Sequence, residues 1–283
     1  MLIDMHIHVV PPGLPGVGTL NPILRESPET LARSLRAEMA RAGITQALAM
    51  GVYTNAADDP LGIASSQRIA RLVPGLGLIG VANPDLTEPE HFRRVERLLS
   101  SGQIRALKAY LGYLHYPPDH ANYRRYYELA EQYRLPVIFH TGDTYSPYAK
   151  LKYAHPLGID EVAVDHPNVR FVIAHVGNPW MQDAAEVVYK NVNVWVDVSG
   201  LVVGGPEAFD ETDPVAAGVL ADVRERLAMA FRYAERPNRF LFGTDWPLAP
   251  LTPYRDLIRS AIPPMHAEQV FTENAQRLFG LGP

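Results

Sequence analysis

Cysteine is absent from this chain of 283 residues. Disulfides and thiolate ligands are therefore excluded, and any transition-metal site must be built from histidine and carboxylate side chains. No apolar run reaches the roughly 20 residues that a bilayer-spanning helix needs. The start of the chain also lacks a basic segment followed by an apolar one. We expect a cytoplasmic protein with no membrane partner.

No block of like charge stands out either. The net charge of −5 comes from interspersed acidic and basic residues, so no basic surface that would follow a phosphate backbone is expected, and no nucleic-acid partner. With 47% hydrophobic residues the chain can bury a large core, and α/β barrels of this size often form one domain. We expect one domain over residues 1–283. A homo-oligomer is compatible with the sequence, which leaves the oligomeric state open.

The segment 2–8 predicts a strand that begins a metal site. Side chains alternate between the two faces of a strand, so Asp4, His6 and His8 should share one face. Two imidazoles then lie side by side near the end of the strand. Asp4, one pleat deeper, is either a buried acceptor that orients a ligand imidazole or a structural carboxylate bonded to the backbone.

Three later apolar strands each end in a potential metal ligand, namely His140, His175 and Asp245. A single histidine at a strand end is usually a surface or hydrogen-bonded group. Chance rarely places a histidine or aspartate at the same end of four separate strands, however, so the joint pattern favours a site. The remaining histidines divide into three expected on the surface (His91, His166, His266) and three in loops near the site (His115, His120, His155).

The whole chain alternates between strand and helix patterns, without hairpin signals. This rhythm predicts a parallel sheet, and eight units are the number that closes a (β/α)₈ TIM barrel. A helix is expected from the Ser27 cap to Gly43, and a last helix, near 267–279, should distort the simple barrel by capping or flanking it. The long segment 9–30 is a candidate substrate loop. The expected strands are 2–8, 44–50, 75–81, 104–110, 137–140, 169–175, 192–198 and 240–245.

In such a barrel the carboxyl ends of the strands surround one mouth, where active sites are built. Three or four neutral imidazoles and a carboxylate suit Zn²⁺ or another borderline divalent ion, with one position left for water. Such an ion lowers the pKa of its bound water to ~7 and polarises a carbonyl, which is the usual route to hydrolysis at neutral pH.

The order of these motifs resembles the amidohydrolase superfamily, in particular its amidohydrolase-related branch of metal-dependent TIM-barrel hydrolases. The resemblance covers essentially the whole chain and is unspecific as to substrate, since the branch includes hydrolases, lactonases and nonoxidative decarboxylases. The motifs that carry it are Ile3-Asp4-x-His6-x-His8, Lys108, His140-Thr141-Gly142, Ala174-His175-x-Gly177-Asn178-Pro179, Asp197-x-Ser199-Gly200, Gly243-Thr244-Asp245-Trp246-Pro247 and Glu273-Asn274-Ala275-x-Arg277-Leu278-Phe279.

By position, the resemblance implies one divalent metal ion, with zinc as the expected element, held by His6, His8, His140 and Asp245. His175 would then lie beside the metal-bound water and polarise it or donate a proton. Lys108 has three interpretations. It is carboxylated and bridges two metals, as in binuclear relatives; it is unmodified and binds a substrate carboxylate; or it is a barrel lysine paired with an acid.

The favoured function is a metal-dependent hydrolase of a small-molecule amide, lactone or ester, in which Asp245 takes a proton from the activated water and His175 steadies the oxyanion or protonates the leaving group. The alternatives are a nonoxidative decarboxylase of an aromatic or vinylogous carboxylic acid at the same site, and a metal-binding barrel without turnover. Loop residues either indicate an aromatic or carboxylated ligand or are ordinary loop residues: Tyr113, Tyr116, Tyr145, Tyr148, Lys150 and Lys152.

Overall fold

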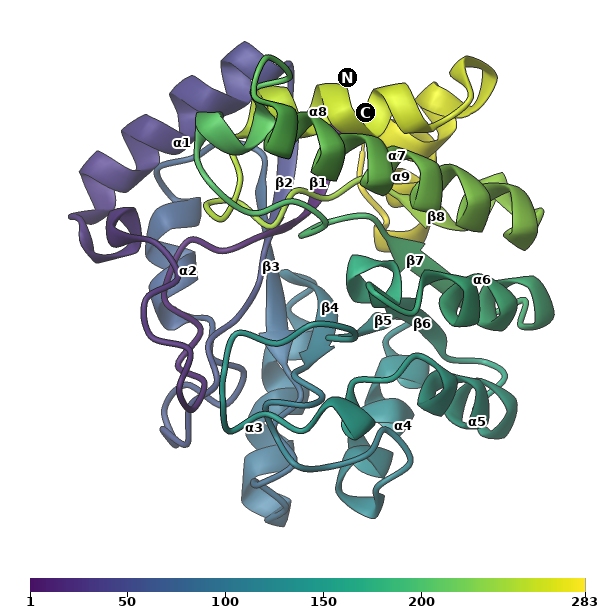
Figure 1. Cartoon of the computed structure of the whole chain (residues 1–283). Helices are drawn as coiled ribbons and strands as arrows, with labels where there is room; N and C mark the ends of the chain where they lie inside the picture. Colours follow the sequence, from purple (N-terminus) through teal and green to yellow (C-terminus); the bar gives the residue numbers. More distant parts are fainter. Residues whose placement is uncertain (283) are drawn as a thin grey trace.

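Eight parallel strands, neighbours in chain order, form the sheet at the centre of the protein, and the computed structural model describes residues 1–282. Figure 1 shows the strands surrounded by helices, which confirms the predicted (β/α)₈ TIM barrel. The strands are β1 (Ile3–Ile7), β2 (Gln46–Ala49), β3 (Leu76–Val81), β4 (Ile104–Ala109), β5 (Pro136–Phe139), β6 (Arg170–Ile173), β7 (Val194–Asp197) and β8 (Phe240–Leu241).

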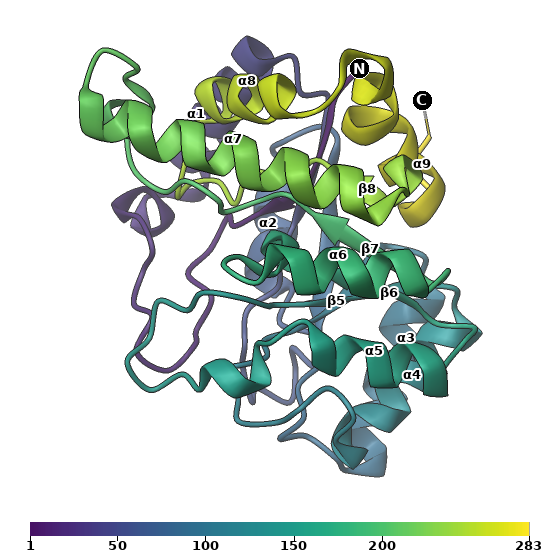
Figure 2. The same ribbon diagram turned by 45° about the vertical axis from the view of Figure 1, so that its right-hand side comes forward.

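The helices lie outside the strands, as the view turned by 45° also shows (Figure 2). Each of the first seven follows the strand of the same number and returns the chain to the start of the next, which is the right arrangement for parallel neighbours. The helices are α1 (Pro28–Ala42), α2 (Ala64–Ala70), α3 (Pro89–Ser100), α4 (Arg124–Gln132), α5 (Leu157–Asp165), α6 (Met181–Lys190), α7 (Pro214–Ala234), α8 (Leu251–Ala261) and α9 (Asn274–Phe279).

Helix α1 shows how local sequence sets the boundaries. The Ser27 hydroxyl accepts a hydrogen bond from the backbone amide of Thr30, Pro28 occupies the first turn, and Gly43 ends the helix in a left-handed conformation. Leu35 and Met39, one turn apart, are buried on the same face. The predicted start and end of this helix are confirmed.

The strand side chains pack in two groups, one inside the barrel and one against the outer helices. The inner group includes Met5, Ile79 and Val172 and extends to Leu278 and Phe279 of α9. The carbonyl of Leu278 also accepts a hydrogen bond from Arg170 at the start of β6, at 3.0 Å. Helix α9 therefore closes the end of the barrel opposite the mouth, as expected for the last helix. In residues 1–282, no helix combines the length and apolar character that crossing a membrane would require.

The barrel closes at a short seam between β1 and the segment that follows β8. The prediction of a strand over 240–245 is wrong in its second half, because β8 ends at Leu241 and Asp245 adopts a positive φ of 66° that takes the backbone out of the extended conformation. Beyond β8, the Asp245 amide donates to the His6 carbonyl (2.8 Å), and the His8 amide donates to the Trp246 carbonyl (2.6 Å). The seam therefore runs directly beside the candidate ligands.

Candidate metal centre and its pocket

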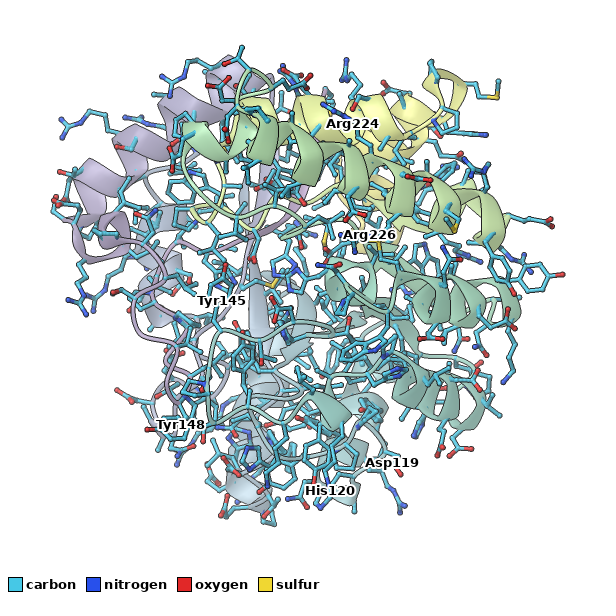
Figure 3. All side chains as sticks on the ribbon, viewed as in Figure 1. Asp119, His120, Tyr145, Tyr148, Arg224 and Arg226 are labelled. Carbon is cyan, nitrogen blue, oxygen red and sulfur yellow. The ribbon has the colours of Figure 1, made fainter. Side chains whose placement is uncertain are left out.

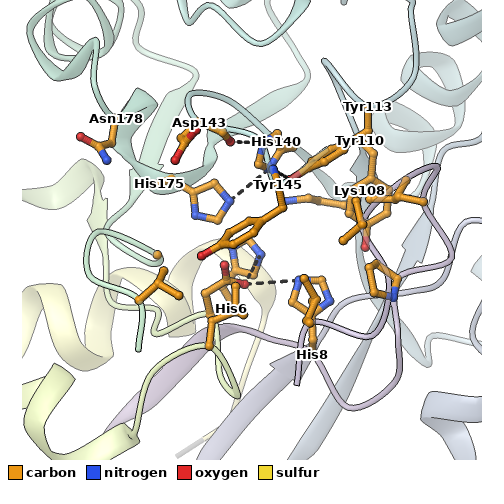
Figure 4. Close-up of a pocket in the computed structure, with 18 residues that line it drawn as sticks. His6, His8, Lys108, Tyr110, Tyr113, His140, Asp143, Tyr145, His175 and Asn178 are labelled. Carbon is orange, nitrogen blue, oxygen red and sulfur yellow. Dashed lines mark hydrogen bonds and ion pairs between the residues drawn. The ribbon is translucent and has the colours of Figure 1, made fainter. Parts of the chain in front are cut away.

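A pocket opens at the carboxyl ends of the strands, and the close-up in Figure 4 shows its lining. The empty space between the lining residues, open solvent at the mouth included, is about 640 Å³. The expected substrate loop, 9–30, supplies part of the apolar wall. The lining residues are His6, His8, Pro12, Leu14, Val17, Leu20, Lys108, Tyr110, Tyr113, His140, Asp143, Tyr145, His175, Asn178, Gly200, Val203, Asp245 and Leu248.

His6 is held by a carboxylate at the end of β7. Its Nδ1 lies 3.0 Å from Oδ2 of Asp197 and 3.0 Å from the hydroxyl of Ser199, which itself donates to Asp197. Burial opposes ionisation of Asp197, but the hydrogen bond from His6 and the nearby His175 and Lys108 hold its pKa well below the usual range, so it is an ionised acceptor. Burial lowers the pKa of His6 to about 4. His6 is therefore neutral at neutral pH, with the proton on Nδ1 and a lone pair on Nε2.

Asp245 brings a second carboxylate to His6 of β1 and to His8, which directly follows this strand. Its Oδ1 lies 3.3 Å from Nε2 of His8 and 3.6 Å from Nε2 of His6. That oxygen is buried and has no hydrogen-bond partner in residues 1–282, and the same holds for Nδ1 of His8. Since Nε2 of His6 carries no proton, two acceptors face each other here, which is unfavourable unless a cation lies between them. The three residues form a group that could hold a metal ion, with ligand atoms within 4.8 Å of one another.

His140 and His175 face each other in a similar way. Nε2 of His140 donates to the carbonyl of Asp143 (2.9 Å), and Nδ1 of His175 donates to the carbonyl of Ser199 (3.1 Å). The two remaining nitrogens, 3.2 Å apart, then direct lone pairs at each other. Burial lowers the pKa of both histidines, which disfavours a shared proton at neutral pH. A cation beside these atoms would remove the conflict, so the donor set fits a divalent ion.

The structure does not bring every predicted ligand into one group. Two sets of three residues have ligand atoms within 4.8 Å of one another: the one formed by His6, His8 and Asp245, and another formed by His6, His175 and Asp197. His140 belongs to neither set. Its ring instead packs against the ring of Tyr113, with centroids 4.7 Å apart.

The two predicted catalytic residues, His175 and Asp245, have strained backbone conformations that orient their side chains. His175 and Asp245 both have positive φ, 58° and 66°, a conformation that is uncommon outside glycine and is found preferentially at functional sites. Gly200 makes room for them, because a Cβ atom at this position would come within 2.8 Å of Nδ1 of His175 and 3.2 Å of Oδ2 of Asp245. The loop after β7 therefore requires glycine at this point.

Lys108 lies inside the barrel, as strand phase predicts. Its side chain is 1% exposed, and its Nζ has no hydrogen-bond partner in residues 1–282. Burial lowers its pKa to about 8, against the opposing effect of Asp197 and Asp245. The interpretation of a lysine paired with an acid is therefore wrong for the described residues, since Nζ lies beyond 4.0 Å from every carboxylate oxygen in them.

Asp4 is the structural carboxylate of the two alternatives. It accepts hydrogen bonds from the backbone amides of His6 and Thr244 and from the Thr244 hydroxyl. The pairing register of β1 shifts between Asp4 and Ile7, so strict alternation does not carry Asp4 beneath the imidazoles. The carboxylate that orients His6 is Asp197, which was quoted in a sequence motif but given no role.

Of the six loop residues noted in the sequence, Tyr113 and Tyr145 line the pocket. Tyr116 instead donates to Asp85, and the side chain of Tyr148 is 68% exposed. The expectation that His91 lies on the surface is wrong, since it is buried and its Nε2 lies 2.7 Å from the Tyr126 hydroxyl. Asn178, which lines the pocket after β6, was quoted in a motif but given no role.

Comparison with known proteins agrees with the fold. The family model described as Amidohydrolase matches residues 3–281. No curated protein matches the chain.

Solved structures of the same fold are distant in sequence. An uncharacterized TIM-barrel protein from Bordetella bronchiseptica is 22% identical, with 99% of this chain and 98% of that chain covered and a TM-score of 0.67. A 5-carboxyvanillate decarboxylase from Sphingomonas paucimobilis is 16% identical, with 99% of each chain covered and a TM-score of 0.61. A 4-oxalomesaconate hydratase from Rhodopseudomonas palustris is 14% identical, with 99% of this chain and 96% of that chain covered and a TM-score of 0.62. At these identities the similarity shows the fold alone.

Proposed function

The chain belongs to the amidohydrolase family, and we propose on that basis that it is a metal-dependent hydrolase of a small-molecule amide, lactone or ester. The observation that carries the proposal is the convergence of acceptors at the barrel mouth. The lone pair of His6 and the unpaired Oδ1 of Asp245 face each other at 3.6 Å, and Nε2 of His8 lies 3.3 Å from the same oxygen. Such an arrangement is stable when a cation is bound.

One divalent ion, with zinc as the proposed element, would be held by His6, His8, His140 and Asp245. Imidazole nitrogen and carboxylate oxygen are ligands that zinc accepts in catalytic sites. When bound, the ion would polarise a substrate carbonyl and make a water molecule acidic enough to react near neutral pH. Lys108 would stay unmodified, because these four residues suffice for a single ion.

Asp245 and His175 would move the protons. Oδ2 of Asp245 is the oxygen nearer to Gly200, and a carboxylate held ionised by its histidine neighbours can accept a proton as the nucleophile forms. His175 is neutral, with its Nδ1 proton fixed on the Ser199 carbonyl, so Nε2 can take up a proton and deliver it to the leaving group. The fixed tautomer of His175 and the ionised carboxylate of Asp245 support this division of roles.

A second candidate function is nonoxidative decarboxylation, and Lys108 is the observation that favours it. A decarboxylase needs a dedicated cation beside the carboxylate that departs, and Lys108 lines the pocket with an Nζ that has no hydrogen-bond partner in residues 1–282. The same lysine can bind the carboxylate of a substrate that is hydrolysed elsewhere. One buried cation therefore serves either chemistry, and hydrolysis stays the first proposal because it is the commoner reaction of the wider superfamily.

The test assays protein purified without chelator against lactones, amides, esters and hydroxybenzoate-type acids. Proton release and CO₂ release are recorded separately for the parent and for Lys108→Met. Turnover of an ester, lactone or amide with no CO₂ supports the hydrolase. Release of CO₂ from an acid, with no turnover of esters, lactones or amides, establishes the decarboxylase instead. A protein that binds metal and converts none of these compounds supports the barrel without turnover.

A further inference from the structure

Asn178 places a side-chain amide in the wall of the pocket, three residues after His175. Its backbone is fixed on both sides. The Asn178 amide donates to the His175 carbonyl (2.9 Å), and the Asp143 amide donates to the Asn178 carbonyl (2.8 Å). Gly142 has a φ of 85°, and a Cβ atom there would collide with the Asn178 backbone. The position of this residue is therefore set by the loops after β5 and β6 together.

The orientation of the amide is set from outside the barrel by Arg226 of α7. Its Nη1 donates to Oδ1 of Asn178 at 2.7 Å, while its Nε donates to Asp222 at 2.8 Å. A guanidinium has only donors, so the atom it contacts must be the oxygen of the amide. The other end of the amide, Nδ2, carries two N–H donors, and neither has an acceptor among residues 1–282. A donor at a pocket wall without a protein acceptor is available to a ligand.

The neighbouring charge restricts which ligand group this donor can serve. Asp143 lines the same side of the pocket, and Figure 4 shows its carboxylate beside Asn178, with Lys108 on the other side of the histidines. A ligand carboxylate at Asn178 would meet the Asp143 charge, whereas a neutral oxygen would not. The cationic Lys108 side is the place for a carboxylate.

We propose that Asn178 is a specificity-determining residue, which donates a hydrogen bond from Nδ2 to an uncharged hydroxyl or carbonyl oxygen of the substrate, and that Arg226 is the positioning residue that fixes this amide. The ligand class is a small organic acid whose carboxylate binds on the Lys108 side and whose neutral oxygen reaches Asn178. The inference rests on the proposed function only in taking the pocket as the substrate site, and it does not depend on which reaction follows.

Arg224 offers a matched control two residues away on α7. Its Nε donates to the Ser260 hydroxyl at 2.9 Å, and it pairs with Glu211, so it too is an arginine bonded to an acid. Figure 3 shows Arg226 on the side of α7 toward the barrel mouth and Arg224 on the opposite side. Removing either guanidinium alters the helix surface to a similar extent, but only the change at Arg226 removes the hydrogen bond to Asn178.

The experiment measures calorimetric dissociation constants of the metal-loaded protein for benzoate, 3-hydroxybenzoate and 4-hydroxybenzoate. The parent should bind at least one hydroxybenzoate about tenfold more tightly than benzoate, as one good hydrogen bond allows. Asn178→Ala should reduce that preference to about one while metal content and benzoate affinity stay close to those of the parent. Arg226→Met should reduce it at least threefold, Arg226→Lys should restore most of it, and Arg224→Met should leave it unchanged.

Three results would overturn the inference. The first is a parent that binds none of the three acids or shows no preference for a hydroxybenzoate. The second is a preference that survives in Asn178→Ala. The third is equal behaviour of Arg226→Met and Arg224→Met, which would remove the positioning role. Because binding is measured without turnover, a protein with the expected preferences and no hydrolysis would refute the proposed function and leave this inference standing.

Discussion

Nδ1 of His6 lies 3.0 Å from Oδ2 of Asp197, and this contact between β1 and β7 decides which imidazole nitrogen faces the pocket. Because the ionised carboxylate accepts the Nδ1 proton, Nε2 is the nitrogen left for a metal. Asp197→Asn offers an amide that can donate as well as accept, so the preferred tautomer is lost. We predict that it weakens zinc affinity ~10–100-fold, measured by competition with a chromogenic chelator.

The matched variant is Asp4→Asn, which alters the other buried carboxylate near His6. Burial raises the pKa of Asp4 to about 7, so the carboxyl is largely protonated below that pH, and an amide is a mild change. It should leave zinc affinity within about threefold of the parent and act mainly on stability, through the bonds to Thr244. An equal loss of affinity in both variants would contradict the distinct role of Asp197.

Removing a ligand and removing a proton carrier should have separable effects. His6→Ala deletes a nitrogen donor, so metal and activity should disappear together. His175→Asn keeps a residue type that tolerates the positive φ at this position, and it should keep most of the metal while turnover falls about 100-fold or more. Metal content by elemental analysis, beside kcat on the same preparations, makes the comparison. Similar metal loss in both would make His175 a ligand.

The protein should bind about one divalent ion per chain with Lys108 unmodified. The buried Nζ has no hydrogen-bond partner in residues 1–282, and its lowered pKa, about 8, keeps it mainly cationic at neutral pH, whereas carboxylation needs the neutral amine. Elemental analysis gives the stoichiometry, and a density map of the loaded protein shows the lysine. Two ions per chain, or a carboxylated Lys108, would contradict the single-ion site.

In the metal-free protein, His6, His140 and His175 should lower the stability as the pH falls from about 7 to about 4, whereas Asp4, whose pKa burial raises to about 7, opposes them in the same window. Burial lowers the pKa values of His6, His140 and His175 below the ordinary value of histidine, that of His6 to about 4. The unfolded chain takes up these protons first, so the contribution of these histidines to the free energy of unfolding rises with pH between the folded and unfolded pKa values. For His6 the difference corresponds to roughly 3 kcal/mol.

Urea unfolding of chelator-treated protein at several pH values tests this dependence. His6→Gln removes one of these histidines, so the stability difference between parent and variant should change by roughly 3 kcal/mol across the window. A difference that stays constant with pH would refute the buried neutral state of His6.

Much of the site could be predicted because strand geometry is regular. Hydrophobic runs that end in a polar residue place His140 and His175 at the mouth, and the alternation of side chains along a strand places His8 and Lys108 there. Asp245 is harder to predict from strand geometry, since it lies four residues beyond the end of β8 on irregular backbone. The motif Gly243-Thr244-Asp245-Trp246-Pro247 nevertheless identified it as a candidate ligand. The general position of a ligand thus follows from the pattern of the strands.

The roles of the carboxylates could not be predicted in the same way. Asp4 and Asp197 are both buried acids on strands. Asp4 bonds to Thr244 and Asp197 bonds to the His6 ring, a difference that follows from the register shift in β1 and not from alternation along the strand. Asn178 is similar, because its use depends on Arg226, 48 residues away on a helix. Contacts between distant segments depend on packing, which single-sequence periodicity does not encode.

The seam between β1 and the segment after β8 has a consequence for how the protein is made in the cell. Asp4 and Thr244, which it joins, are 240 positions apart. At ~5–20 residues per second, the ribosome adds the second of them roughly 10–50 s after the first. His6 and His8 are therefore synthesised long before Asp245, and until Asp245 emerges one edge of β1 has no partner. The candidate metal centre becomes complete only after all eight strands have been synthesised, so the ion enters a nearly finished barrel.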